Sequence, residues 1–179
     1  VMRYCLMLAT YHAYKGHFYL LEAFKDVLED YPDLILRIYG DGFFHEKKQV
    51  ADEVDRLGIK NNVILGDFTP NTAPLLAGAS ILLMPSQAQE SFGLAIIEAM
   101  AFGVPVVVTN VGGMPEILHE SNAGFVCSKD DPREFSCAMK KILGDPTLSS
   151  ELGHSGRLTF ENRFAATAMA QKYNNFLKN

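Results

Sequence analysis

Short runs of apolar residues alternate along the chain with longer amphipathic segments. The short runs are rich in Leu, Ile and Val without strict polar alternation, which is typical of strands buried on both faces. They predict strands at 4–10, 34–39, 62–65, 80–84, 104–108 and 124–127. The longer segments repeat apolar residues at spacings of three and four, and this periodicity predicts helices. These lie at 16–30, 44–57, 71–77, 93–102, 115–119, 132–143, 147–153 and 164–177.

Residues with strong positional preferences support the ends of these helices. Asp131-Pro132 and Asp145-Pro146 each place a capping carboxylate before a proline at the first helical position. Gly58 stands directly after a predicted helix, where a left-handed residue ends it. Regular alternation of strands and helices implies right-handed crossovers. The fold class is therefore α/β, with a doubly wound parallel sheet of about six strands and a helical C-terminal tail.

Composition narrows the classes of function. Of the 179 residues, 48% are apolar and 21% are charged, as in ordinary globular domains. A net charge of −5 without a Lys/Arg block disfavours binding to nucleic acid or to an anionic membrane. No apolar stretch reaches the roughly 18 residues of a membrane-spanning helix. The three cysteines form no CxxC pair, which disfavours a disulfide framework or a zinc ribbon.

The chain begins almost directly in an apolar run, residues 4–9. No basic region followed by a cleavage site precedes this run, so we expect no signal peptide and a cytoplasmic location. Because the chain starts in a predicted buried strand, we expect residues 1–179 to be one domain excised from a longer protein.

In a doubly wound sheet, ligands bind at the carboxyl ends of the strands, so the loops after strands are the candidate sites. The first loop, residues 10–17, lacks the GxGxxG pattern of dehydrogenases. It carries Lys15 at a helix start, where a cation is favourable only if an anion lies beside it. The alternative is a solvated surface lysine. His12 and His17 are expected to be loop and surface residues.

The turn at residues 40–42, Gly-Asp-Gly, permits close approach of a ligand or is an ordinary turn.

The segment 85–103 is the most informative. Its helix begins near residue 92 or 93, and the amides of the first turn are suited to phosphate or hydroxyl oxygens. The helix is apolar on almost every face and carries one carboxylate, Glu98. We expect Glu98 to be buried and to bind sugar or ribose hydroxyls, because no Lys or Arg lies within two turns. Glu90 would lie at the mouth of the same cleft. The alternative is that Glu98 faces solvent and Glu90 is an ordinary loop carboxylate.

The segment 109–116 offers a second group of backbone amides. Gly112 and Gly113 precede a predicted helix that has Pro115 near its start. Successive amides in such a turn can form an anion-binding nest. The alternative is a common loop-to-helix turn.

These segments together resemble the C-terminal half of retaining glycosyltransferases of family 4, whose GT-B architecture has two facing Rossmann-like domains. Glu90 and Glu98 meet the E-x7-E signature of that family. The residues that match the family pattern around these glutamates are 90–94, 98–101, 103–107 and 112–116. Further matching pieces are Lys15-Gly16, Gly40-Asp41-Gly42, Leu57-Gly58, Leu65-Gly66, Pro85-Ser86 and Asp145-Pro146. The resemblance runs from about residue 4 to residue 177.

The resemblance implies a role for each matching position. Lys15 would contact the diphosphate of a nucleotide-sugar donor, and Glu90, the candidate catalytic residue, would hold hydroxyls of the transferred sugar. Glu98 would hold the ribose hydroxyls. The segment Gly66-Asp67-Phe68 would lie near the nucleotide base. Donor sugar and phosphate oxygens would be bound around the start of the helix, at Ser91, Phe92, Gly93 and Leu94.

The implied reaction is transfer of a sugar, of the hexosyltransferase type, to an acceptor hydroxyl with retention at the anomeric carbon. Such enzymes use front-face attack without a protein nucleophile and usually need no metal, so we expect neither metal nor cofactor. By family association alone, we expect a role in the assembly of polysaccharide or lipopolysaccharide.

One position departs from the family pattern. The family carries Gly-Arg where this chain has Ala9 and Thr10. Arginine would clamp the departing diphosphate through two hydrogen bonds, and threonine cannot replace its charge. Either Lys15 and the helix N-termini suffice, or another cation serves, or activity is reduced.

In this architecture the acceptor binds an N-terminal domain, to which the C-terminal tail crosses. We expect that domain to lie outside residues 1–179. We expect any membrane contact to be peripheral and to be made by that domain. The tail residues expected to expose apolar surface are Phe164, Ala168, Tyr173, Phe176 and Leu177. The chain alone is expected to bind donor nucleotide weakly and to turn over little substrate.

Two alternatives remain: half of a GT-B nucleotide-sugar epimerase, or a non-catalytic doubly wound interaction module.

Overall fold

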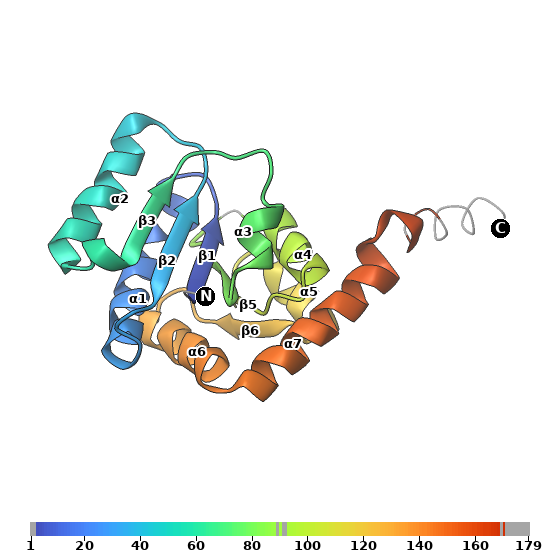
Figure 1. The fold of residues 1–179 in the computed structure, drawn as a ribbon. Helices are drawn as coiled ribbons and strands as arrows, with labels where there is room; N and C mark the ends of the chain where they lie inside the picture. The colour runs from blue at the N-terminus through green and yellow to red at the C-terminus, as the bar shows by residue number, and fades with distance from the viewer. Residues whose placement is uncertain (1–2, 89, 91–92, 169, 171–179) are drawn as a thin grey trace.

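The computed structural model describes residues 3–88, 90, 93–168 and 170, and its centre is a parallel β-sheet (Figure 1). Six strands in the described part of the chain pair in the order β3-β2-β1-β4-β5-β6, all parallel. They are β1 (Tyr4–Leu8), β2 (Ile35–Tyr39), β3 (Val63–Gly66), β4 (Ile81–Met84), β5 (Val106–Thr109) and β6 (Gly124–Cys127). The predicted Rossmann-like α/β fold class is confirmed.

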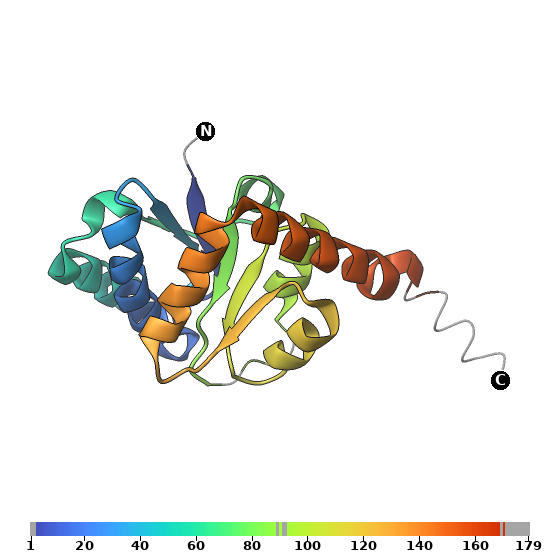
Figure 2. The ribbon, with the colours of Figure 1, turned by 90° about the horizontal axis from the view of Figure 1, so that it is seen from below.

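Helices cover both faces of the sheet (Figures 1 and 2). They are α1 (His17–Asp30), α2 (Phe44–Leu57), α3 (Ala73–Ala77), α4 (Leu94–Ala101), α5 (Met114–Ser121), α6 (Pro132–Gly144) and α7 (Pro146–Thr159). Short 3-10 turns occupy Ala13–Lys15 and Lys60–Asn62, and a π turn occupies Phe160–Phe164. Within the described residues, no helix has the length and apolar character needed to cross a membrane.

The core is divided by the sheet into two layers. Cys5 and Met7 of β1 point into a cluster with α1, α2 and α6. Leu6, between them, points into the opposite cluster with α3, α4 and α5. Successive strand residues therefore serve opposite faces, as expected of strands buried on both sides. Helix α7 contacts α4, α5 and α6, and so links the two layers.

The predicted helix ends are mostly confirmed, with differences near the C-terminus. Asp131 and Asp145 cap α6 and α7 by accepting hydrogen bonds from first-turn amides. The helix expected at 147–153 runs instead from Pro146 to Thr159. Gly153 lies within it, where a Cβ would come 2.2 Å from the carbonyl oxygen of Gly103 in the turn after α4.

The predicted exposed tail is only partly within the described residues. Phe164 is half-buried and packs against the cluster beneath α4 and α5, so its predicted exposure is wrong. The π turn at the end of α7 brings it back onto α4. Ala168 is also intermediate in exposure. Tyr173, Phe176 and Leu177 lie outside the described residues, as does most of the predicted helix 164–177.

The strand order identifies where a ligand would bind. From β1 the chain adds β2 and β3 outward on one side, then returns to place β4 on the other side of β1. This reversal is the topological switch point of a doubly wound sheet, where the loops after β1 and β4 diverge and leave a crevice. Lys15 lies in the first of these loops and Glu90 in the second.

Candidate functional site

An ion pair joins the loops after β1 and β4. Lys15 Nζ lies 2.7 Å from Glu90 Oε2, and the two side chains are only 17% and 11% exposed. Ser86 Oγ donates a second hydrogen bond to the same carboxylate oxygen, at 3.2 Å. Lys15 is thus not the solvated surface lysine of the alternative interpretation. The two residues predicted to hold the diphosphate and the sugar are in direct contact at the switch point.

The backbones of these two loops are in close contact. Gly16 has φ +82°, and a Cβ built on it would lie 1.9 Å from the carbonyl oxygen of Pro85. The amide of Gln87 donates to the carbonyl of Tyr14 at 2.7 Å. A side chain at position 16 is excluded by both the conformation and the space, so glycine is required beside Lys15.

The loop after β5 fixes Glu90 from the other side. Gly112, at φ +58°, is so close that a Cβ would lie 1.9 Å from the carbonyl oxygen of Glu90. The amide of Gly113 donates to that same oxygen at 3.2 Å. The amide of Gly113, which was predicted to form a nest for a ligand, therefore holds the main chain of Glu90 instead.

Glu98 is exposed, so the prediction that it is buried is wrong. Helix α4 buries its other faces through residues such as Ile96 and Met100, but Leu94 and Glu98, four positions apart, share an uncovered stripe. The hydroxyl of Thr72 donates to Glu98 Oε2 at 3.0 Å. The positions of the two glutamates are reversed from the prediction: Glu90 lies inside the site and Glu98 lies at its edge.

The start of α4 is only partly described. Gly93 is buried with φ +61° and precedes the first helical residue, Leu94, as predicted. Ser91 and Phe92, which complete the predicted donor-binding turn, lie outside the described residues.

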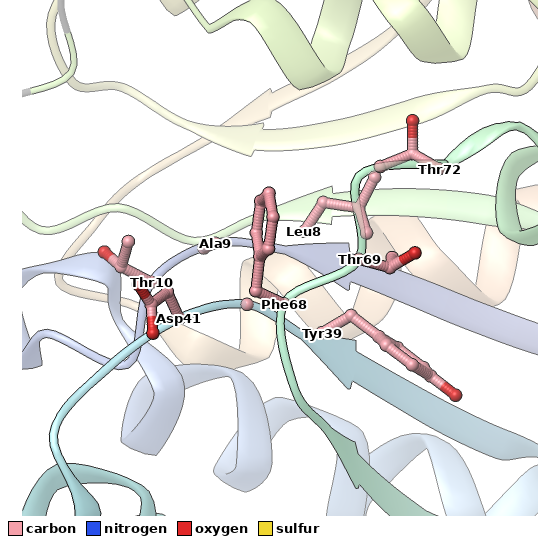
Figure 3. A pocket seen from close by; sticks show the side chains of 9 residues that line it. Leu8, Ala9, Thr10, Tyr39, Asp41, Phe68, Thr69 and Thr72 are labelled. Atoms are coloured by element: carbon pink, nitrogen blue, oxygen red, sulfur yellow. The ribbon is translucent and has the colours of Figure 1, made fainter.

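A cavity of about 350 Å³ opens at the carboxyl ends of β1 and β2 (Figure 3). The ring of Phe68 stands in it beside Leu8 and Ala9. Thr10 and Asp41 lie at one end, and the segment after β3 closes the other side with Thr69 and Thr72. Thr72 also binds Glu98, so the second glutamate lies at the rim of this cavity.

The predicted base-binding segment divides into two parts. Phe68 is 67% exposed and lines the cavity. Gly66 instead packs against the ring of Tyr39, and its carbonyl accepts a hydrogen bond from the hydroxyl of Tyr11 at 2.8 Å. Asp67 pairs with Lys47. Only Phe68 of this segment is thus presented to a ligand in the cavity.

Thr10 has an unsatisfied polar atom. Its hydroxyl oxygen is buried and has no hydrogen-bond partner among the described residues, although it borders the cavity. A buried hydroxyl without a partner costs free energy, so it is a ready hydrogen-bonding group for a bound molecule. No group of three or more His, Cys, Asp or Glu residues in the described part of the chain could hold a metal ion.

His17 is buried, so its predicted surface position is wrong. It occupies the first turn of α1 beneath Tyr11, with the two ring centroids 5.2 Å apart and nearly parallel. Neither ring nitrogen has a hydrogen-bond partner within the described residues. Burial lowers the pKa of His17 to about 4, which keeps the imidazole neutral at physiological pH.

The lowered pKa of His17 predicts acid sensitivity. The unfolded chain takes up a proton near pH 6.5 and the folded chain only near pH 4, so the free energy of unfolding falls as the pH drops between these values. We expect a loss of about 1–2 kcal/mol between pH 7 and pH 5 from this residue. His17→Phe keeps an aromatic ring but cannot titrate, so urea denaturation at both pH values should show a smaller loss.

A matched control is His154→Gln, which changes an exposed histidine of α7. It should retain the acid sensitivity of the parent chain. An equal loss of stability in His17→Phe and in the parent would contradict the assignment to His17.

Comparisons with known proteins place this geometry in a family. Residues 2–159 match the family described as Glycosyl transferases group 1. N-acetyl-alpha-D-glucosaminyl L-malate synthase of Bacillus anthracis is 30% identical, over 86% of this chain and 39% of the relative. The capsular polysaccharide biosynthesis glycosyltransferase CapM of Staphylococcus aureus is 29% identical, over 92% of this chain and 44% of the relative.

Solved structures share the fold. HepE of Anabaena, determined in complex with UDP and glucose, superposes with a TM-score of 0.88 at 24% identity, covering 98% of this chain and 48% of HepE. TarM of S. aureus gives 0.86 at 19% identity, over 99% of this chain and 36% of TarM. The chain thus spans less than half the length of these relatives. It belongs to the group 1 glycosyltransferases and has the Rossmann-like fold of one domain of a GT-B enzyme.

Proposed function

We propose that this chain is the donor-binding half of a retaining glycosyltransferase that moves a sugar from a nucleotide-diphosphate sugar to an acceptor hydroxyl. The observation that carries the proposal is the Lys15–Glu90 pair at the switch point, and the loop that holds Lys15 also lines the open cavity through Thr10. A lysine here supplies a point charge for the diphosphate, and α1 begins two residues later, at His17, where the amides of its first turn are free donors. The carboxylate of Glu90 supplies acceptors for sugar hydroxyls.

The cavity in Figure 3 is suited to the nucleoside. The exposed ring of Phe68 offers a stacking surface for the base. Glu98 at the rim would accept hydrogen bonds from the ribose hydroxyls, and Thr72, whose hydroxyl donates to Glu98, would accept another. The unpartnered hydroxyl of Thr10 would donate to a phosphate oxygen in the place where the family carries arginine.

The transfer itself would need little covalent chemistry from the protein. The bond between the anomeric carbon and the phosphate oxygen breaks, the acceptor oxygen bonds to that carbon on the same face, and the acceptor proton passes to the departing diphosphate. Lys15 stabilises the negative charge that develops on the leaving group. The acceptor would be bound by an N-terminal domain. The relatives are long enough to include such a domain, since this chain covers less than half of their length. Neither a metal ion nor a cofactor takes part in this proposal.

Thermal unfolding in the presence of nucleotides tests the donor site. UDP, GDP, ADP and their common sugar conjugates are compared on the parent chain and on Glu98→Ala. A ligand at a hundred times its dissociation constant stabilises a fold by about 2.7 kcal/mol, a shift that is readily measured. We expect one nucleotide to raise the melting temperature of the parent and to lose much of this effect in Glu98→Ala.

The matched control is Glu151→Ala, which removes an exposed carboxylate from α7. It should respond to the nucleotide like the parent chain. A panel without any shift in the parent would contradict the proposed donor site, and an equal shift in Glu98→Ala would remove Glu98 from it.

A further inference from the structure

Lys15 and Glu90 each already have a partner of opposite charge before any ligand arrives. Glu90 accepts hydrogen bonds from Lys15 and Ser86 through one carboxylate oxygen. Lys15 also lies over the ring of Tyr14, with its Nζ 5.4 Å from the ring centroid. Both charged groups are mostly removed from solvent, where attraction between opposite charges is strongest. An anion that binds Lys15 must therefore compete with a carboxylate already in place.

The main chain of Glu90 is held by the loop after β5. Its carbonyl oxygen is held by the amide of Gly113 and is in close contact with Gly112. The root of the side chain is thus fixed, whereas the long stem of Lys15 can turn its ammonium toward another partner. An anion that binds Lys15 would therefore take the ammonium away from Glu90, and the carboxylate would stay close to that anion.

The consequence differs for the two forms of a donor. When a sugar is attached to the diphosphate, its hydroxyls can donate hydrogen bonds to Glu90 and replace those lost from Lys15. When the sugar has been transferred, the nucleoside diphosphate offers the carboxylate no donor and brings more negative charge close to it. Like charges at short range disfavour this arrangement.

We propose that Glu90 is an internal counterion of Lys15 that weakens binding of the nucleoside diphosphate product relative to the nucleotide sugar. Re-formation of the Lys15–Glu90 pair then accompanies product release. This inference rests on the proposed donor site and adds to it a selection between substrate and product, in which Glu90 acts through Lys15.

Glu90→Gln tests the inference, because glutamine keeps the shape and a hydrogen-bond acceptor but removes the charge. UDP, GDP and ADP, each alone and as its glucose conjugate, are titrated calorimetrically into the parent chain and the variant. For the nucleotide that binds, we expect the diphosphate to bind about tenfold more tightly to Glu90→Gln, which corresponds to about 1.4 kcal/mol. The glucose conjugate should gain less or lose affinity, so the preference for the conjugate falls.

Glu53→Gln is the matched control. Glu53 pairs with Arg56 on α2, and its side chain is 14% exposed, so the variant makes the same change of charge at a carboxylate of similar exposure. It should leave both affinities unchanged. In a Lys15→Met background, Glu90→Gln should gain less than tenfold for the diphosphate, because no ammonium is released.

The outcomes separate the two proposals. Equal affinity of the parent and Glu90→Gln for the diphosphate, with measurable binding in both, would overturn the counterion role and leave the donor site intact. Weaker binding of both diphosphate and conjugate would show that Glu90 only supports the loop, and would also overturn it. Absence of binding by every nucleotide in both proteins would overturn the donor site and this inference together.

Discussion

Gly112→Ala is expected to lower the free energy of unfolding by about 3 kcal/mol or more. The φ of +58° alone disfavours a side chain, and the added Cβ would lie 1.9 Å from the carbonyl oxygen of Glu90. Relief would require the loops after β4 and β5 to separate, which would break the hydrogen bond from Gly113 to Glu90. Urea denaturation followed by circular dichroism measures the loss.

Gly58→Ala provides the control for this substitution. Gly58 has a similar φ of +72°, but a Cβ built there meets nothing within 4 Å. It should cost only about 1 kcal/mol, the strain of the left-handed conformation. If the two variants lose the same stability, the tight contact between the loops around Glu90 is not a constraint on the fold.

Lys15→Met is expected to weaken binding of a nucleoside diphosphate at least about tenfold, because a charge-assisted hydrogen bond to phosphate is lost and Glu90 remains as an unpaired carboxylate. Methionine keeps most of the length of the side chain without its charge. Calorimetric titration with the nucleotide found by the thermal panel measures the loss.

The specificity of this effect depends on comparison with another lysine. Lys48→Met removes a cation that pairs with Asp52 on the exposed side of α2. Its affinity for the nucleotide should match that of the parent chain. Equal affinity in Lys15→Met and Lys48→Met would show that the ammonium at the switch point does not contact the phosphates.

The periodic pattern of apolar residues predicted the strands and most helices well, because both are local. It could not predict that Lys15 and Glu90 touch. They are separated by 75 positions in the chain, and they meet only because β4 returns to the side of β1 opposite to β2. Apolar runs identify strands buried on both faces but carry no information on their order in the sheet.

The errors at Glu98 and His17 have the same origin. The composition of α4 indicates a buried helix, but whether one stripe of it is covered depends on what packs against it, and Leu94 beside Glu98 is 68% exposed. His17 follows a loop and reads as polar, yet the loop folds back and lays Tyr11 over it. Burial at both positions is set by how other segments fold onto the helix, which the spacing of apolar residues within the helix does not indicate.

The pairing of α1 with α6 bears on how the molecule is made. Tyr19 of α1 meets Phe135 of α6 edge to face, and Lys140 of α6 pairs with Asp30 at the end of α1. During synthesis, α1 therefore emerges long before the helix that covers it. Until α6 has left the ribosome, the part of α1 that packs on α6 lacks its partner and is open to chaperones and to other nascent chains, and closure of so long a loop is slow.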